Sequence, residues 1–466
     1  AIVVYLLLRQ VLKRFISVGQ AKATAALLAI IYLIHPLNIQ AVTYVVQRIT
    51  ALAALFSVLS VLAYYQFRTT QRFKVIWALI TLAAFGLAVM TKQNTVVIPI
   101  LWYATERFIV RPHAPWKKDL IGLAVVAIIA AAVATVFWPT IDALTTETDN
   151  VTRLQYFLAQ GPILWIYAFK FFVPINLHLE YSYGISSFPL WLSVVAWIAH
   201  AGVVLAAIKA LTKQPLITFG IAWFYITHSV ESSVIPIKDF AFEHRTYLPN
   251  VGLLFAIAPL FSRLIASKRI GLIVIPFVVM LLFTAQSAYR NYQWANHFRF
   301  YNNELSYNPQ NYRVMNETAR YAVAEEEFQR AAKIYRTLVD ERGIRDEAIL
   351  INAIVANAGL KDWEKVKLLE DMAFARINQY HPSYRARLQL SRGIRLKETG
   401  QCDAAYEWFA KVQQAFPGEF SSLLFRTQCD VKTGNTERAN STLNQLIKVA
   451  PNEPRVIELR QQLENQ

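Results

Sequence analysis

Long apolar runs separated by short polar segments fill the first 289 residues of the chain. A helix needs roughly 20 apolar residues to cross a bilayer core. Runs near that length predict membrane-crossing helices at 16–34, 49–67, 75–91, 95–110, 119–138, 188–208, 215–230, 248–266 and 270–288. The shorter segment 163–173 ends at Pro174 and is interpreted as a re-entrant or interfacial helix. Residues 1–8 read as the last turns of an earlier crossing, so we interpret the chain as a fragment; a cleaved signal peptide is the alternative.

The pattern changes after residue 289, where apolar positions follow the period of amphipathic helices. A 34-residue register places Pro417 on Pro451, and it also matches Gly400 with Gly434, Ala405 with Ala439, and Phe409 with Leu443. This is the period of tetratricopeptide repeats, which are stacked pairs of helices. Segments 322–339 and 359–377 fit as second helices of degenerate repeats. We therefore predict an all-α chain, with a multi-pass transmembrane bundle in 1–289 and a soluble repeat superhelix in 290–466.

Charge supports this division and gives it an orientation. The net charge is +16, and 55% of the residues are hydrophobic. Residues 1–289 carry 22 Lys and Arg against 9 Asp and Glu, whereas the remainder carries 25 against 22. The positive excess therefore belongs to the membrane half, where the positive-inside rule explains it without nucleic acid. If the repeats lie outside, 16 of those 22 basic residues fall in inner loops, which predicts an extracytoplasmic repeat domain.

The polar segments on the predicted outer face contain the candidate functional residues. Segment 35–48 lies between two crossings, where polar groups are costly unless they face a cavity or a ligand. The same face receives residues 92–94, segment 177–184 and loop 231–249. The candidates in these segments are His35, Gln40, Arg48, Lys92, Gln93, Glu180, Glu243, His244, Arg245 and Tyr247.

Cations beside apolar helices suit a ligand that is both anionic and lipidic. Arg binds phosphate through a bidentate fork and Lys as a point charge, and a nearby carboxylate could accept a proton from an attacking hydroxyl. Each residue also has a structural explanation. Lys92 could snorkel, Arg48 and Arg245 could anchor the interface, and His35 could simply end a helix before Pro36.

The remaining histidines do not indicate a metal centre. His200 and His228 are expected to be hydrogen-bonded inside the bundle. No His or Cys group has the spacing of zinc ligands, and the sequence has neither a glycine-rich phosphate loop nor a nucleophile elbow. We expect no metal and no other cofactor.

Four sequence motifs together resemble a known family. They are His35–Pro36 followed by Ala41–Val42, Arg48 and a Leu-Ala-Ala-Leu run; Lys92–Gln93–Asn94; Leu177–Gly184; and Glu243–His244–Arg245 with Tyr247–Leu248–Pro249. The last is similar to a Glu-His-Arg-x-Tyr-Leu-Pro loop and is the most specific. These motifs resemble the transmembrane and tetratricopeptide-repeat O-mannosyltransferases, and more closely their bacterial relatives.

The resemblance implies a GT-C-type glycosyltransferase of the bacterial inner membrane. Such an enzyme takes a sugar from a polyprenyl-phosphate donor on the extracytoplasmic face, here for a protein Ser/Thr hydroxyl or another envelope acceptor. Gln40 and Gln93 stand where some relatives have Glu, so neither can be a base. Enzymes of this type carry an acidic catalytic residue in their first external loop, which would precede Ala1.

The expected roles follow from this chemistry. Arg245, Lys92 and Arg48 would neutralise the leaving phosphate; His35 and His244 would donate to phosphate or sugar; Tyr247 would orient the donor; Glu243 would position Arg245; and Glu180 would lie at the acceptor site. The repeats could bind the protein acceptor, or they could form a rigid lid or assembly surface. Two other functions stay open: a lipid-sugar transporter, although no internal symmetry is visible, and a non-catalytic envelope scaffold.

The two cysteines, Cys402 and Cys429, both lie in the predicted repeats. The 34-residue register places Cys402 near the start of one unit's second helix and Cys429 near the end of the next unit's first helix. Those two ends should be neighbours, so an oxidising compartment would allow a disulfide. Two buried thiols are the alternative.

Overall fold

The computed structural model describes residues 1–113, 151–181, 187–237, 240–267 and 270–464, with the single residues 124, 128, 131, 132 and 135. The regular elements in these residues are all helices, and no strand occurs among them, which confirms the predicted all-α class. The chain divides into two compact units, Ala1–Ala295 and Asn296–Gln466.

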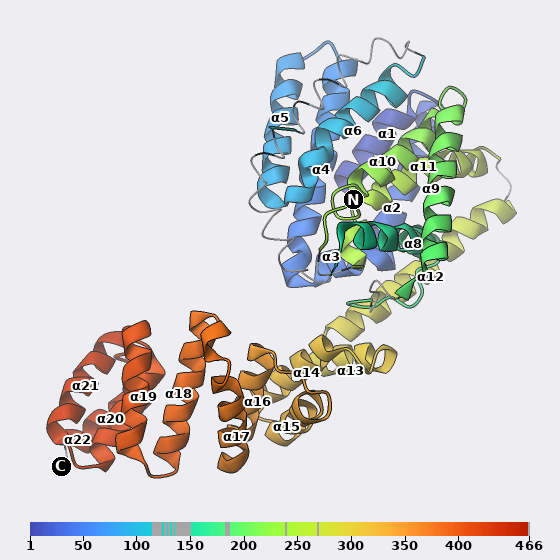
Figure 1. Ribbon diagram of the computed structural model, residues 1–466. Helices are drawn as coiled ribbons and strands as arrows, with labels where there is room; N and C mark the ends of the chain where they lie inside the picture. Colours follow the sequence, from blue (N-terminus) through green and yellow to red (C-terminus); the bar gives the residue numbers. More distant parts are fainter. Residues whose placement is uncertain are drawn as a thin grey trace. The chain divides into compact units, whose positions relative to one another are not determined.

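Apolar helices of different lengths build the first unit (Figure 1). They are α1 (Ile2–Leu12), α2 (Val18–Ile34), α3 (Ile39–Thr43), α4 (Arg48–Thr69), α5 (Lys74–Thr91), α6 (Ile98–Ala104), α8 (Arg153–Phe172), α9 (Leu190–Ala210), α10 (Pro215–His228), α11 (Pro249–Ala266) and α12 (Ile270–Trp294). Short 3-10 helices follow or precede them at η1 (Pro36–Asn38), η2 (Val45–Gln47), η3 (Gln93–Val97) and η7 (Glu243–Thr246).

Four segments of the described chain are long and apolar enough to cross a membrane, namely Val45–Thr69, Lys74–Thr91, Leu190–Ala210 and Pro249–Ala266. They confirm apolar helices of spanning length at the predicted positions 49–67, 75–91, 188–208 and 248–266. Helix α2 passes the same test only together with Pro36–Thr43, from which it is bent by 54°. The bend lies at His35, whose backbone is extended because the following proline disfavours the helical conformation there.

Other predicted crossings differ from the structure. Segment 95–110 is divided among η3, α6 and the π-helix η4 (Thr105–Val110), and α10 has only 14 residues. At 1.5 Å per residue, α10 extends about 21 Å, which is shorter than a bilayer core. Segment 270–288 is part of the longer α12. The predicted crossing 119–138 lies almost entirely outside the described residues.

Helix α8 contains the segment 163–173 as its second half. The helix begins ten residues earlier, at a capping box in which the Thr152 hydroxyl accepts from the Gln155 backbone and the Gln155 side chain accepts in return from Thr152. This Thr-x-x-Gln pattern is a start signal that hydropathy alone does not show. The segment that the sequence suggested as a short re-entrant or interfacial helix is therefore the C-terminal half of a 20-residue helix.

The backbones of α10 and α11 are so close at their crossing that only glycine fits there. Gly220 of α10 faces Gly252 of α11, and a Cβ atom added to Gly252 would lie 2.5 Å from the Gly220 carbonyl oxygen. Small residues at such crossings let two backbones meet. Because α10 ends just before the loop that starts at Glu231 and α11 follows η7, this contact fixes two segments of the candidate site.

Ten helices build the second unit: α13 (His297–Tyr307), α14 (Tyr312–Ala324), α15 (Phe328–Arg336), α16 (Glu347–Gly359), α17 (Trp363–Phe374), α18 (Pro382–Glu398), α19 (Cys402–Ala415), α20 (Phe420–Lys432), α21 (Thr436–Val449) and α22 (Pro454–Glu464). Each packs against the next, and α14, α16, α18, α20 and α22 also contact one another in that order. Figure 1 shows these helices in succession from yellow to red.

The last two helix pairs follow the 34-residue register. Ala405 and Ala439 are both fully buried, and Gly400 and Gly434 both take a left-handed backbone conformation, at φ 84° and 73°. The earlier predicted helices start too soon, because the true ones begin at Phe328 and Trp363. Glu326 and Lys361 occupy the left-handed positions before them, where the sequence has no glycine to mark the turn. The identity of the array as tetratricopeptide repeats stays a prediction.

The two cysteines form a disulfide that joins α19 to α20. Cys402 is the first residue of α19, and Cys429 lies near the end of α20, with Cα atoms 5.4 Å apart. The predicted proximity of these two helix ends is confirmed.

Candidate functional site

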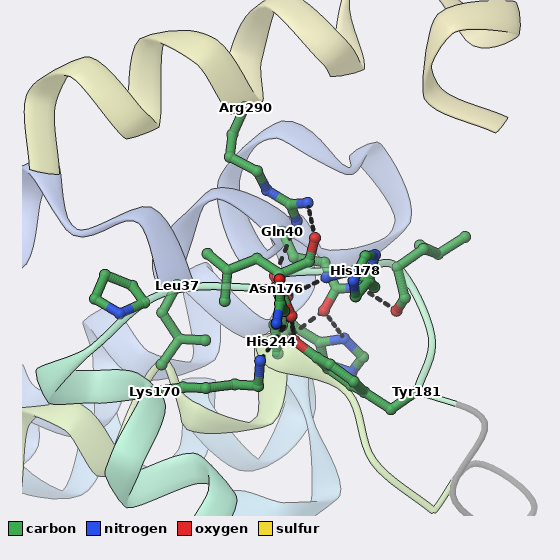
Figure 2. A network of polar contacts seen from close by, with 12 residues as sticks. Leu37, Gln40, Lys170, Asn176, His178, Tyr181, His244 and Arg290 are labelled. Atoms are coloured by element: carbon green, nitrogen blue, oxygen red, sulfur yellow. Dashed lines mark hydrogen bonds and ion pairs between the residues drawn. The ribbon is translucent and has the colours of Figure 1, made fainter. Parts of the chain in front are cut away.

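The predicted outer segments meet in a network of buried polar groups. Figure 2 shows Arg290 reaching from α12 toward residues of the segment after α8 and of η7. At its centre, the Glu243 carboxylate is fully buried. Its Oε1 accepts from the Tyr181 hydroxyl and from the His178 backbone N–H, both at 2.6 Å, and its Oε2 accepts from Arg290 Nη2 at 3.0 Å. Glu243 therefore holds three chain segments together.

Gln40 joins α3 to the same network. Its Oε1 accepts from the His244 backbone N–H at 2.7 Å and lies 3.2 Å from His244 Nδ1. Its Nε2 donates to the Leu179 carbonyl at 2.7 Å. Both ends of this amide are used inside the protein, which is a positioning role that a carboxylate could not fill in the same way, since it lacks a donor.

His35 is also bound at both ring nitrogens. Its Nδ1 accepts from the Leu37 backbone N–H at 3.2 Å, so Nε2 carries the proton and donates to the Phe171 carbonyl at 2.8 Å. The ring stacks on Phe171 and meets the edge of Phe283. In this structure His35 connects α2, α8 and α12.

A second cluster of buried charges lies at the ends of α5, α10 and the start of α4. Lys92 Nζ is 2.9 Å from Glu231 Oε1 and donates to Thr50 Oγ1 at 3.2 Å. The Lys92 side chain is 17% exposed and that of Glu231 10%. Lys92 is thus paired with a carboxylate, which explains why it lies away from bulk water.

Arg245 belongs to this cluster as a second buried cation. Its Nη1 donates to the Phe240 carbonyl at 3.4 Å. Burial acts to lower the pKa of Arg245, but Tyr156 and the charge of Glu231 outweigh burial and raise the pKa. Lys92 and Arg245 therefore place two buried cations near Glu231. Two cations in a buried setting at the ends of apolar helices are suited to an anionic ligand.

The cluster also changes the protonation of its neighbours. Burial of the Glu231 carboxyl acts to raise its pKa, but Lys92 and Arg245 outweigh burial and lower the pKa to about 2. Burial and the charge of Lys92 lower the pKa of His244 to about 3. At neutral pH, Glu231 is therefore ionised and His244 is a neutral imidazole.

The structure does not bring every predicted site residue into these two networks. Arg48 is exposed, and its Nε donates to the Val42 carbonyl at 3.2 Å; Gln93 is exposed as well. Tyr247 packs on Tyr32, with ring centroids 5.2 Å apart, and Glu180 is half-buried between Leu179 and Tyr181 in the chain. Glu243, which was expected to position Arg245, pairs with Arg290, and Glu231 is a carboxylate whose charge acts on Arg245.

Sequence reasoning missed Arg290, Glu231 and Tyr156 as members of these networks. It also expected both His200 and His228 to be satisfied. His200 is, because its nitrogens lie 2.8 Å from the Tyr225 hydroxyl and 2.9 Å from the Gly161 carbonyl. For His228 the expectation is wrong: neither ring nitrogen has a hydrogen-bond partner within the described residues.

The fold and the site define an all-helical protein with apolar helices of membrane-spanning length and buried ionic clusters at the helix ends. Comparisons with protein-family models, with curated proteins and with solved structures found no match to this chain.

Proposed function

We propose that this protein is an integral membrane glycosyltransferase. It would move a sugar from a polyprenyl-phosphate donor to a protein hydroxyl or another envelope acceptor on the extracytoplasmic side of a bacterial inner membrane. The observation that carries the proposal is the position of two buried cations, Lys92 and Arg245, near Glu231 at the ends of apolar helices. A lipid-linked phosphate presents negative charge at that depth, and the resemblance of the surrounding motifs points to the same substrate class.

In this proposal the reaction is an inverting displacement at the anomeric carbon. The oxygen of the acceptor hydroxyl attacks that carbon while the bond from the carbon to the phosphate oxygen breaks, and the lipid phosphate leaves with the bonding electrons. The proton of the hydroxyl passes to a carboxylate at the acceptor site, for which we propose Glu180. Lys92 and Arg245 stabilise the charge that develops on the leaving phosphate, which is the term that usually contributes most to such catalysis. Glu231 has a pKa of about 2 and is a poor proton acceptor, so its role is to hold the two cations in place.

The donor would be a substrate, and we propose no metal or other cofactor. Neutral His244 directs its Nδ1–H to Gln40 Oε1, so its Nε2 can accept a hydrogen bond from a sugar hydroxyl, and it does not donate to the phosphate as the sequence suggested. Glu180, on the segment next to Tyr181, is the carboxylate that we propose for the acceptor site. The second unit is proposed to present the protein acceptor, and the disulfide in it fits an oxidising extracytoplasmic compartment.

The test is sugar transfer from labelled polyprenyl-phosphate hexoses in detergent micelles. We expect Lys92→Met and Arg245→Gln each to lower kcat by about 10²–10³-fold, the loss typical of removing one stabilising group. Lys209→Met and Arg263→Gln, which alter exposed cations of α9 and α11, are matched controls and should keep wild-type rates. Size-exclusion profiles show which variants remain folded. Wild-type transfer by both site variants would reject the site and favour a non-catalytic scaffold.

A further inference from the structure

Glu231 and three buried side chains near it hold polar atoms that have no hydrogen-bond partner in the described part of the chain. These atoms are Gln160 Oε1, His228 Nδ1 and Nε2, Glu231 Oε2 and Ser232 Oγ. Their residues are 0%, 1%, 8% and 5% exposed. An unmade hydrogen bond at a buried group costs about 1–3 kcal/mol, so several such groups in one place indicate a binding site rather than a packing detail.

The four residues are joined through the backbone of two loops. The Ser232 backbone N–H donates to the His228 carbonyl at 2.8 Å, which keeps both on one turn. Gln160 Nε2 donates to the Phe240 carbonyl at 3.2 Å, and the same oxygen lies 3.4 Å from Arg245 Nη1. The Gln160 amide and the Arg245 guanidinium are thereby held at the same carbonyl oxygen.

Glu231 connects the two parts of this arrangement. The Tyr156 hydroxyl, one turn before Gln160 on α8, donates to the Glu231 carbonyl at 2.7 Å. One carboxylate oxygen of Glu231 contacts Lys92, and the other is the unpaired Oε2. The His228 ring stacks on Tyr167, whose hydroxyl accepts from the Phe242 backbone N–H at 2.9 Å.

The chemistry of the unpaired atoms identifies the missing partner. Glu231 Oε2 and Gln160 Oε1 can only accept, a neutral imidazole has one donor and one acceptor, and the Ser232 hydroxyl can do both. A phosphate oxygen offers acceptors and would leave the carboxylate and amide oxygens unsatisfied. Hydroxyl groups donate and accept together, so a polyol satisfies this set and an anion does not.

We propose that Gln160, His228, Glu231 and Ser232 form a subsite for the hydroxyl groups of the transferred sugar, next to the Lys92 and Arg245 cations that hold the phosphate. This subsite rests on the proposed function and adds the residues that recognise the sugar. Glu231 then has two roles, with one oxygen on Lys92 and the other on a sugar hydroxyl. A carboxylate that accepts from a neutral hydroxyl is a common form of carbohydrate recognition and requires no change in protonation.

The test compares two ligands on the full chain in detergent micelles: a bare polyprenyl phosphate, and the same lipid carrying mannose, glucose, galactose or N-acetylglucosamine. The variant His228→Phe removes both ring nitrogens and keeps an aromatic ring against Tyr167 and Phe224. We expect the wild type to bind at least one sugar-bearing lipid more tightly than the bare lipid. His228→Phe should weaken that binding by about tenfold, the worth of one or two hydrogen bonds, and leave the bare-lipid Kd unchanged.

Two further variants separate recognition from folding. His228→Gln, which retains a donor and an acceptor, should recover part of the sugar preference. Ser232→Ala deletes only a hydroxyl and should also lower the preference for the sugar-bearing lipid. It provides the test if His228→Phe fails to fold. We also expect His228→Phe to unfold at the same temperature as the wild type or above it, because a buried imidazole without partners does not stabilise the empty protein.

Each contrary outcome has a distinct meaning. A wild type that binds the bare lipid but prefers none of the four sugars rejects the subsite and leaves the phosphate site standing. The subsite is also rejected if His228→Phe and Ser232→Ala weaken the binding of the bare lipid and of the sugar-bearing lipid equally. It is rejected as well if neither variant changes the binding of either lipid. Failure of the wild type to bind even the bare polyprenyl phosphate rejects the proposed function itself.

Discussion

Arg290 donates from Nη2 to Oε2 of Glu243 across 3.0 Å, and the two side chains are 4% and 0% exposed. The pair joins the end of α12 to η7, which also carries Arg245. Arg290 donates in addition to the Leu177 carbonyl, so one guanidinium holds both segments of the Glu243 network.

Removal of one partner of this pair should be strongly destabilising. We expect Arg290→Met to lower the free energy of unfolding by about 3–5 kcal/mol, because the Glu243 carboxylate would stay buried without its cation. Replacement of both residues, Arg290→Met with Glu243→Gln, should cost less than the single change, since no uncompensated charge then remains. Chemical unfolding in detergent measures both values. The exposed Arg263→Met is the control, with an expected change below about 0.5 kcal/mol. A single variant as stable as this control would contradict the pair's structural role.

The ionisation of Glu231 should make stability depend on pH. This residue lies outside the candidate membrane spans, and despite burial the charges of Lys92 and Arg245 lower its pKa from 4.5 to about 2. A group whose pKa is lower in the folded state stabilises the fold above its unfolded pKa, and that contribution is lost as the pH falls through the folded value.

We therefore expect the unfolding temperature of the wild type to decrease between about pH 4.5 and pH 2. Lys92→Met removes the cation paired with Glu231 and so raises the folded-state pKa of that carboxyl toward its unfolded value; the decrease should therefore be smaller and should be complete at a higher pH. Thermal unfolding across this range measures the effect, with Lys209→Met as the matched control because that lysine is exposed on α9. If the Lys92→Met profile overlaid that of the wild type, the Glu231 carboxylate would not depend on Lys92.

The sequence predicted one member of each buried ion pair as a site residue, Lys92 in one and Glu243 in the other. It missed their partners, Glu231 and Arg290. Lys92 and Arg245 were expected on one face because each follows or precedes a long apolar run. Glu231 was only the first residue of a polar loop, and nothing in its local pattern connects it with Lys92. Arg290 follows the apolar run that ends near residue 288, so hydropathy assigned it to the second domain. The helix continues to Trp294, and Arg290 is buried there because Glu243 compensates its charge.

The sequence also could not show which buried histidines have hydrogen-bond partners. His200 and His228 both lie on apolar helices and gave the same expectation, yet only His200 finds partners, in Tyr225 and the Gly161 carbonyl. The partners come from other helices, so only the tertiary arrangement separates the two cases. The 34-residue register succeeded for α18 to α21 because glycine marks both turns, and it was misplaced where Glu326 and Lys361 take that conformation.

The glycine contact between α10 and α11 should tolerate no added methyl group. In Gly220→Ala the new Cβ would lie 2.5 Å from the Ala256 backbone nitrogen, so the helices must separate. We expect a loss of about 1–3 kcal/mol of stability, the usual cost of overpacking. Gly202→Ala in α9 is the matched control, because no atom lies within 4 Å of its added Cβ. It should be neutral or stabilising, since alanine favours helix. Equal stability of the two variants in thermal unfolding would show that α10 and α11 are not in close contact.

The disulfide between Cys402 and Cys429 should contribute measurably to the second unit. The bonded residues are 27 positions apart, and closing a loop of that size stabilises a fold by about 3–4 kcal/mol in the chain-entropy model. We expect the double variant Cys402→Ser with Cys429→Ser to unfold at a lower temperature than the wild type without reductant. Dithiothreitol should bring the wild type close to that variant and leave the variant itself unchanged, which controls for other effects of the reagent. Thiol labelling of denatured, unreduced protein purified from the cell envelope should find no free thiol. Two free thiols would show that the bond does not form in that compartment, and they would remove one support for placing the second unit outside the membrane.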